Sequence, residues 1–202
     1  IYRAVTTGVR KSGKPIFPVM PYRNYGQADP EDVRAVIAYL RSIQPIENKV
    51  PESSSDFPMN FIVNTIPQKA VPGKIPTDKK DSIAQGKYLF TIAACHECHT
   101  PFEKGKYDET FSMAGGRVFQ LPGGVVTSAN ITPDKKTGIG NWTREMFVDR
   151  FTQYRDSAQA HRAVGKGELQ SVMPWTMYAT MKDEDLNNIY SYICTLKPIH
   201  HE

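Results

Sequence analysis

The chain has few cysteines and no long hydrophobic run. Only three of its 202 residues are cysteines, which excludes a small disulfide-rich scaffold. No segment approaches the roughly 18 consecutive apolar residues of a membrane span, and the mean hydropathy is −0.46. We therefore expect no membrane insertion by these residues. The composition, 40% hydrophobic and 23% charged, is typical of a globular protein with a core.

A strong charge of one sign is also absent. Lysine and arginine number 25 against 21 aspartate and glutamate residues, which leaves a net charge of +4. The basic residues form no clustered stripe of the kind that nucleic-acid-binding proteins use to contact phosphates. We expect no nucleic-acid partner.

The chain does contain a partial repeat at an offset of 153 residues. Met20-Pro21-Tyr22 matches Met173-Pro174-Trp175, and an aspartate follows each methionine after twelve positions. In both copies this aspartate opens a segment with apolar residues at i, i+3, i+4 and i+7, the pattern of one face of a helix. These segments contain the stripes Val33, Val36, Ile37 and Leu40, and Leu186, Ile189, Tyr190 and Ile193.

The repeat predicts one complete unit and part of another. Residues 80–202 form the complete unit, and residues 1–46 have only the second half of such a unit. Residues 47–79 contain five prolines, a run of three serines and no helical stripe, which is typical of an extended linker. Because so short a segment as 1–46 rarely folds alone, we expect a preceding segment to complete it.

Cys95, Cys98 and His99 form a Cys-x-x-Cys-His motif. Two thiols at this spacing on a helical turn reach the same edge of a haem, and the adjacent histidine lies beneath its face. Two alternatives fit less well. A thioredoxin-like redox pair is expected near a β-α-β pattern, which this sequence lacks. A structural zinc site needs a second pair of ligands, and no second Cys or His pair at a suitable spacing follows the motif. The motif predicts one covalently bound haem c with His99 as an axial iron ligand.

The second axial ligand is expected to be Met173. It lies in a loop before the last helix, at the position where the Met-Pro-aromatic sequence recurs. A thioether is a haem ligand that raises the reduction potential. Four further methionines are interpreted as packing residues: Met113, Met146, Met177 and Met181.

Other residues with ligand-type side chains have simpler interpretations. Cys194 lies among apolar residues of a helix and is expected to be a buried structural thiol. His96 points away from the iron if His99 is the ligand, and His161 is expected on the surface. His200 and His201 are interpreted as tail residues without functional weight.

Several short motifs follow one another along the complete unit: Gly86-Lys87-Tyr88-Leu89-Phe90, Cys95 to Pro101, Ala114-Gly115-Gly116, Asn130-Ile131-Thr132-Pro133-Asp134, Thr137-Gly138-Ile139-Gly140, Trp142-Thr143, Met173-Pro174-Trp175 and Asp183-Glu184-Asp185-Leu186. Together these motifs resemble the class I cytochrome c domains of the multihaem cytochrome subunits of membrane-bound alcohol, gluconate and aldehyde dehydrogenases. The resemblance covers essentially all of residues 80–202 and implies an all-α class I cytochrome c fold, preceded by the C-terminal half of a second cytochrome c-like unit.

The resemblance also implies roles for single residues. The first helix of the complete unit, with Gly86, crosses the last helix beside the haem. A glycine inside a helix, unfavourable by about 1 kcal/mol, independently suggests such a close approach. Asn130 and Trp142 line the propionate side, and Arg117 is a candidate propionate partner. Met20 ligates iron only if a second haem is present, because no Cys-x-x-Cys-His precedes it.

The sequence thus predicts an electron carrier rather than an enzyme. With His99 and Met173 both bound to iron, no coordination position remains for a substrate. We expect single electrons to pass from a dehydrogenase to an oxidase or cytochrome acceptor, on the periplasmic or outer face of an energy-coupling membrane of a bacterium. Two alternatives are a haem-containing relay subunit of a respiratory complex and, with less support, a di-haem enzyme with an open iron site.

Overall fold

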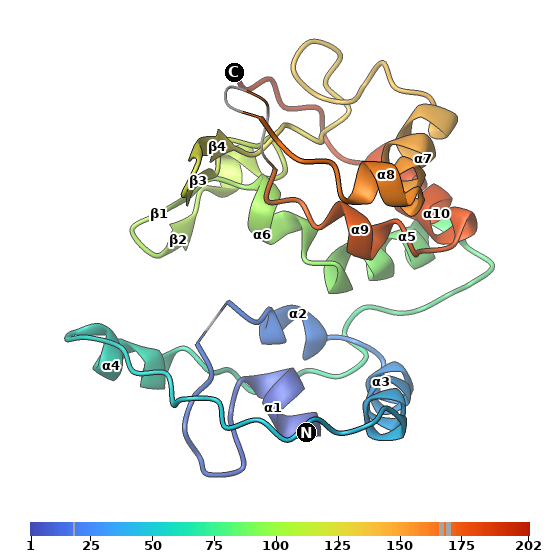
Figure 1. The fold of residues 1–202 in the computed structure, drawn as a ribbon. Helices are drawn as coiled ribbons and strands as arrows, with labels where there is room; N and C mark the ends of the chain where they lie inside the picture. The colour runs from blue at the N-terminus through green and yellow to red at the C-terminus, as the bar shows by residue number, and fades with distance from the viewer. Residues whose placement is uncertain (18, 166–167, 169–170) are drawn as a thin grey trace. The chain divides into compact units, whose positions relative to one another are not determined.

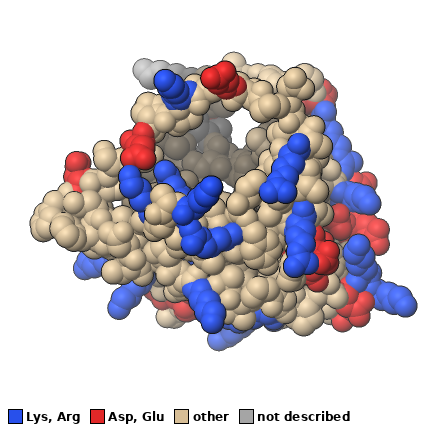
Figure 2. All heavy atoms as spheres, turned by 90° about the horizontal axis from the view of Figure 1, so that it is seen from below, with Lys and Arg blue, Asp and Glu red and all other residues tan. Residues whose placement is uncertain are grey.

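The computed structural model describes residues 1–17, 19–165, 168 and 171–202 (Figure 1). The chain divides into two compact units, Ile1–Thr77 and Asp78–Glu202. Within the described residues, no helix has both the length and the apolar character needed to span a bilayer. Lys and Arg side chains lie scattered among uncharged residues on the face drawn in Figure 2, with Asp and Glu side chains toward its edges.

The first unit is built from short helices. Tyr22 is buried, with 1% of its surface exposed, and its ring lies against Gly8, where a Cβ would come within 2.6 Å of it. Asp29 caps the longest helix by accepting a hydrogen bond from the amide of Glu31, and Pro30 occupies the first turn. The elements of this unit are α1 (Tyr2–Thr7), α2 (Tyr22–Tyr25), α3 (Pro30–Ser42), α4 (Met59–Ile62) and the 3-10 helix η1 (Val63–Thr65).

Residues 47–77 cluster with the first unit instead of forming a free linker throughout. The amides of Val71 and Gly73 donate to the carbonyls of Gly26 and Ala28, at 2.9 and 3.1 Å. Ile75 is buried, with 9% of its surface exposed. Prolines prevent a long helix here, but a proline-rich chain still packs where its apolar side chains and remaining amides find partners.

The second unit is mostly helical, which confirms the coarse fold prediction. Its helices are α5 (Ser82–Ile92), α6 (Cys95–His99), α7 (Arg144–Thr152), α8 (Ser157–Ala160), α9 (Trp175–Tyr178) and α10 (Asp183–Ile193), with 3-10 helices η2 (Glu109–Phe111) and η3 (Gln153–Arg155).

The expectation of an all-α chain needs a correction, because this unit also has two small antiparallel sheets. Strands β1 (Phe102–Glu103) and β2 (Lys106–Tyr107) form one hairpin, and β3 (Val118–Leu121) and β4 (Gly124–Thr127) form the other. The first turn is made by Lys104 and Gly105, both with positive φ, at 49° and 81°. Such turns match the twist of short strands.

Helices α5 and α10 pack closely against each other and carry the core of this unit. A Cβ at Gly86 would lie 1.9 Å from the carbonyl oxygen of Asn188, so only glycine allows this approach. The rings of Phe90 and Tyr192 meet edge to face with centroids 5.2 Å apart. The predicted crossing of the first and last helices at Gly86 is therefore confirmed. The buried core cluster consists of Phe90, Ile139, Phe147, Ile189 and Ile193.

Cys194 is exposed, contrary to the expectation of a buried thiol. Helix α10 turns its stripe of Leu186, Ile189 and Ile193 inward. The next residue along a helix is rotated by about 100° from Ile193, so Cys194 points away from the core.

Candidate functional site

The Cys-x-x-Cys-His motif forms a short helix of its own. Ala94, in the left-handed conformation with φ 56°, separates α5 from α6, so α5 does not continue into the motif. Cys95, Cys98 and His99 all line one cavity. Burial, with the nearby Cys98 thiol, raises the pKa of Cys95 to about 12, and burial also raises the pKa of Cys98. A reactive redox pair needs a lowered thiol pKa, and the pKa of both thiols is shifted in the opposite direction.

His99 is oriented by a backbone carbonyl. Its Nδ1 lies 2.7 Å from the carbonyl oxygen of Ala129, a hydrogen bond that requires the proton on Nδ1. Burial lowers the pKa of His99, and the bond to Ala129 opposes this in part. The imidazole is therefore held neutral with Nε2 free, which is the arrangement of a metal-binding histidine.

The cavity has a volume of about 650 Å³ and lies inside the second unit. Its wall comes from α5, α6, β3, β4, α7, α9, α10 and the loops between them, and most of the lining is apolar. The described lining residues are Phe90, Ala93, Cys95, Cys98, His99, Phe119, Val126, Thr127, Ser128, Ala129, Asn130, Ile131, Thr137, Gly138, Ile139, Trp142, Phe147, Arg150, Phe151, Ser171, Val172, Met173, Trp175, Tyr178, Met181, Leu186, Ile189 and Ile193. This lining, mostly apolar with two thiols and a histidine, fits a large planar apolar group that bonds to thiols at its edge.

Met173 lines the same cavity as His99, although 74 positions separate them in the sequence. The hydroxyl of Ser171 accepts hydrogen bonds from the Met173 amide at 3.1 Å and from the Trp175 indole at 3.2 Å. The Tyr178 hydroxyl donates to the carbonyl of Ala93 at 2.7 Å, which connects the methionine loop to the joint between α5 and α6. The loop is thus tied to the cysteine motif by its own side chains.

The four other methionines of the second unit differ in their burial. Met113 and Met181 pack against the buried core, as expected for packing residues. Met181 also lines the cavity. Met146 and Met177 are exposed over 50% and 72% of their surface and so do not fill a core.

Asn130 and Trp142 both line the cavity, and their place on the propionate side stays a prediction. Asn130 is buried and uses its side chain within the protein. It donates to Thr137 Oγ1 at 2.9 Å and to the carbonyl of Ile199 at 2.7 Å. The carbonyl of Trp142 accepts the hydroxyl proton of Tyr190 at 2.6 Å. Asn130 therefore holds this part of the cavity wall in place by its hydrogen bonds to Thr137 and Ile199.

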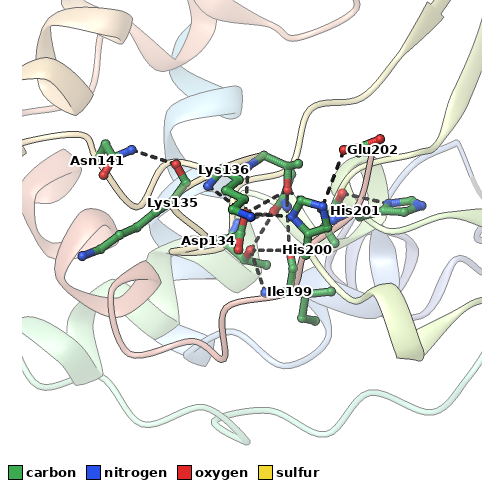
Figure 3. A network of polar contacts seen from close by, with 12 residues as sticks. Asp134, Lys135, Lys136, Asn141, Ile199, His200, His201 and Glu202 are labelled. Atoms are coloured by element: carbon green, nitrogen blue, oxygen red, sulfur yellow. Dashed lines mark hydrogen bonds and ion pairs between the residues drawn. The ribbon is translucent and has the colours of Figure 1, made fainter.

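The C-terminal tail takes part in this network of polar contacts, so it has a packing role that the sequence did not predict (Figure 3). The ring of His201 stacks on Phe111 with centroids 4.2 Å apart, and its Nδ1 lies 3.1 Å from the carbonyl of Ala114. His200 lies 3.5 Å from the carboxylate of Asp134. A histidine near a chain end gives no sequence signal for such packing, so only the structure identifies it.

Arg117 lies beside the cysteine motif but not among the residues that line the cavity. Its guanidinium donates to the carbonyl of Glu97. It also lies over the rings of Phe102, Tyr107 and Phe119, with centroid distances of 5.0, 6.0 and 5.3 Å. These contacts secure α6 against both hairpins. In this arrangement Arg117 supports the motif from outside the cavity.

His96 and His161 lie away from the cavity. His96 Nε2 lies 3.0 Å from Glu109, and its ring contacts Tyr107. His161 is exposed and bonds to the carbonyl of Ser157, as expected of a surface histidine. Sequence reasoning missed Arg150 and Tyr178, which line the cavity. Their only sequence signal is their position in or near helices with an apolar face.

Met20 belongs to the first unit, and the backbone around it forms the same kind of turn as the backbone around Met173. The carbonyl of Met20 accepts from the amide of Tyr22 at 2.8 Å, and the carbonyl of Met173 accepts from that of Trp175 at 2.8 Å. The intervening prolines have φ and ψ of −78° and 54° in the first copy and −79° and 63° in the second. The short helices α2 and α9 follow at the same offset of 153 residues.

Comparisons with known proteins agree with this site. The cytochrome c family matches residues 83–197. The cytochrome c subunit of a quinone-dependent alcohol dehydrogenase from Gluconobacter oxydans is 29% identical over 98% of this chain and 42% of its own length. Its counterpart from Komagataeibacter europaeus is 31% identical over 97% of this chain and 43% of its own length. The fructose dehydrogenase cytochrome subunit of Gluconobacter japonicus is 37% identical over 59% of this chain and 22% of its own length.

The chain thus spans less than half the length of these relatives. The family match covers more than half of the chain and includes the cysteine motif, the cavity and the methionine loop. The chain belongs to the cytochrome c family and is an electron-transfer protein with covalently bound haem c.

Proposed function

We propose that Cys95 and Cys98 bind the haem through thioether bonds and that His99 and Met173 are its axial ligands. The observation that carries this proposal is that all four residues line a single cavity of about 650 Å³. The bound haem supplies a one-electron change between ferric and ferrous iron. The protein contributes burial, orientation of His99 through Ala129 and a sulfur ligand that favours the reduced state.

The ligand assignment is tested by Met173→Leu in the haem-loaded protein. We expect loss of the long-wavelength charge-transfer band of methionine-ligated ferric haem and a lower reduction potential. Met177→Leu is the matched control, because Met177 lies in the same segment and is 72% exposed. Met181→Leu tests the alternative, since Met181 also lines the cavity. If the band survives in Met173→Leu and disappears in Met181→Leu, the assignment of Met173 is wrong.

We further propose that the chain relays electrons within a dehydrogenase assembly on the periplasmic side of a bacterial membrane. The relatives are named as cytochrome subunits of alcohol and fructose dehydrogenases, which supports a dehydrogenase as donor and an oxidase or another cytochrome as acceptor. The test is purification from the native source. Co-purification with a dehydrogenase subunit that reduces the haem supports the proposal, whereas a free carrier in the periplasmic fraction contradicts the relay role.

The first unit supports a further part of this proposal: residues 1–46 are the C-terminal half of a second cytochrome c-like unit. Val36 and Leu40 of α3 expose 55% and 45% of their surface. The matching Ile189 and Ile193 of α10 expose 5% and 2%, because α5 covers them. An exposed stripe in this register is suited to a helix equivalent to α5, supplied by a segment that precedes Ile1.

In such a completed unit Met20 would ligate a second haem. Intact mass together with a pyridine haemochrome assay on the protein from its source counts the haems per chain. Two or more haems on a larger mass support the proposal. One haem on a mass near 22.7 kDa plus the cofactor contradicts it.

A further inference from the structure

Helix α7 brings one arginine to the wall of the cavity. Phe147, Arg150 and Phe151 follow the i, i+3, i+4 spacing of one helix face, and all three line the cavity. Among the described lining residues, Arg150 is the one with a permanent positive charge. It is partly buried in an otherwise largely apolar wall.

The guanidinium of Arg150 is held over an aromatic ring beside Met173. Its central carbon lies 4.6 Å from the centroid of the Trp175 ring, which is within the range of a cation–π contact. Trp175 in turn stacks on Tyr154, with centroids 5.3 Å apart and planes at 13°, and its indole donates to Ser171. Two contacts therefore fix the ring that supports the arginine.

No acidic side chain forms an ion pair with Arg150 within the part of the chain that the structure describes. The ion pairs there involve other cations, including Arg155 with Asp183 and Arg162 with Glu168. Arg144, on the same helix, bonds instead to the carbonyl of Asn187 and lies over Tyr190, outside the cavity lining. Among the described residues, Arg150 thus has no anionic partner and lies in a largely apolar wall.

We propose that Arg150 sets the reduction potential of the haem in this cavity. Ferric iron has one more positive charge than ferrous iron, so a fixed cation nearby disfavours the oxidised state. The repulsion is stronger in an apolar cavity than in water because the effective dielectric constant is lower. Arg150 therefore raises the reduction potential through its charge. This inference rests on the proposed placement of the haem in the cavity.

The test compares the midpoint potentials of haem-loaded variants. Arg150→Gln removes the charge, and we expect a lower potential than in the wild type. Arg150→Lys keeps a positive charge, so its potential should lie closer to that of the wild type. Arg144→Gln is the matched control for net charge, because Arg144 lies on α7 but does not line the cavity, and its potential should not change.

Haem content and the methionine charge-transfer band, measured on the same samples, keep this inference separate from the ligand assignment. A lower potential in Arg150→Gln with haem content and band intact supports the proposal. An unchanged potential, or an equal drop in Arg144→Gln, overturns it. Loss of the band in Arg150→Gln also overturns it, because the arginine would then act by positioning Met173. If Arg150→Gln does not accumulate, Arg150→Met against Arg150→Lys gives the same comparison with the aliphatic stem retained.

Discussion

The crossing of α5 and α10 at Gly86 makes a strong prediction about stability. A Cβ at this position would lie 1.9 Å from the carbonyl oxygen of Asn188 and 2.9 Å from the Cβ of Tyr192. Both obstacles are backbone or backbone-linked atoms, which cannot rotate away. To restore an ordinary contact of 3.4 Å, the helices must separate locally by about 1.5 Å.

This displacement sets the expected magnitude for Gly86→Ala. Overpacking of a core costs about 1–3 kcal/mol, and a backbone clash lies at the upper end of that range. The better helix propensity of alanine offsets about 1 kcal/mol. We therefore expect a net decrease of about 2 kcal/mol in the free energy of unfolding.

Urea unfolding of the haem-loaded protein, followed at the Soret band, measures this change because the signal arises in the second unit. Lys87→Ala is the matched control at the next position of α5, where the side chain is exposed. Its free energy of unfolding should stay within about 0.5 kcal/mol of the wild type. A Gly86→Ala protein as stable as the wild type, or more stable, would refute the close crossing.

Three further predictions concern hydrogen-bonded side chains of the second unit. Arg155 donates to two backbone carbonyls and to Asp183, each at 2.7 Å, so Arg155→Gln should lower the free energy of unfolding by about 1–2 kcal/mol in urea titrations. The amide of Thr137 is the main cause that lowers the pKa of Asp134 to about 2, below its ordinary 3.8, so this carboxylate stabilises the fold above about pH 4 and the contribution is lost as the pH falls toward 2. Asp134→Asn should therefore flatten the acid dependence of stability in that window, and an unchanged slope would contradict this. Asn130→Ala leaves buried partners unsatisfied and should cost about 2 kcal/mol, with faster amide hydrogen exchange in the C-terminal tail.

Several features could be predicted from the sequence because their causes are local. Asp29 and Pro30 mark the start of α3 by capping it, which depends only on neighbouring residues. The mostly helical fold follows from apolar periodicity in the segments that became α3 and α10. Gly86 predicted a close helix approach, since a glycine inside a helix needs a reason other than propensity.

Other features depend on contacts between distant segments. The two hairpins are too short to produce a clear alternating pattern, so the sequence did not reveal them. Val71 and Gly73 are held against the first helices by amide hydrogen bonds to Gly26 and Ala28, far away in the chain. Cys194 lies one position past the buried face of α10, and a shift of one residue decides its exposure.

The sequence by itself determined the proposal for haem attachment, because Cys95, Cys98 and His99 lie within five residues and their spacing alone matches one edge of a haem. Only the tertiary structure decided what surrounds that motif. It brought Met173 and Arg150 to the cavity wall and left Arg117 outside it. The reason is physical: a helix turn is specified by adjacent residues, whereas a cavity wall is specified by how α5, α7 and α10 pack, and that packing depends on the whole unit.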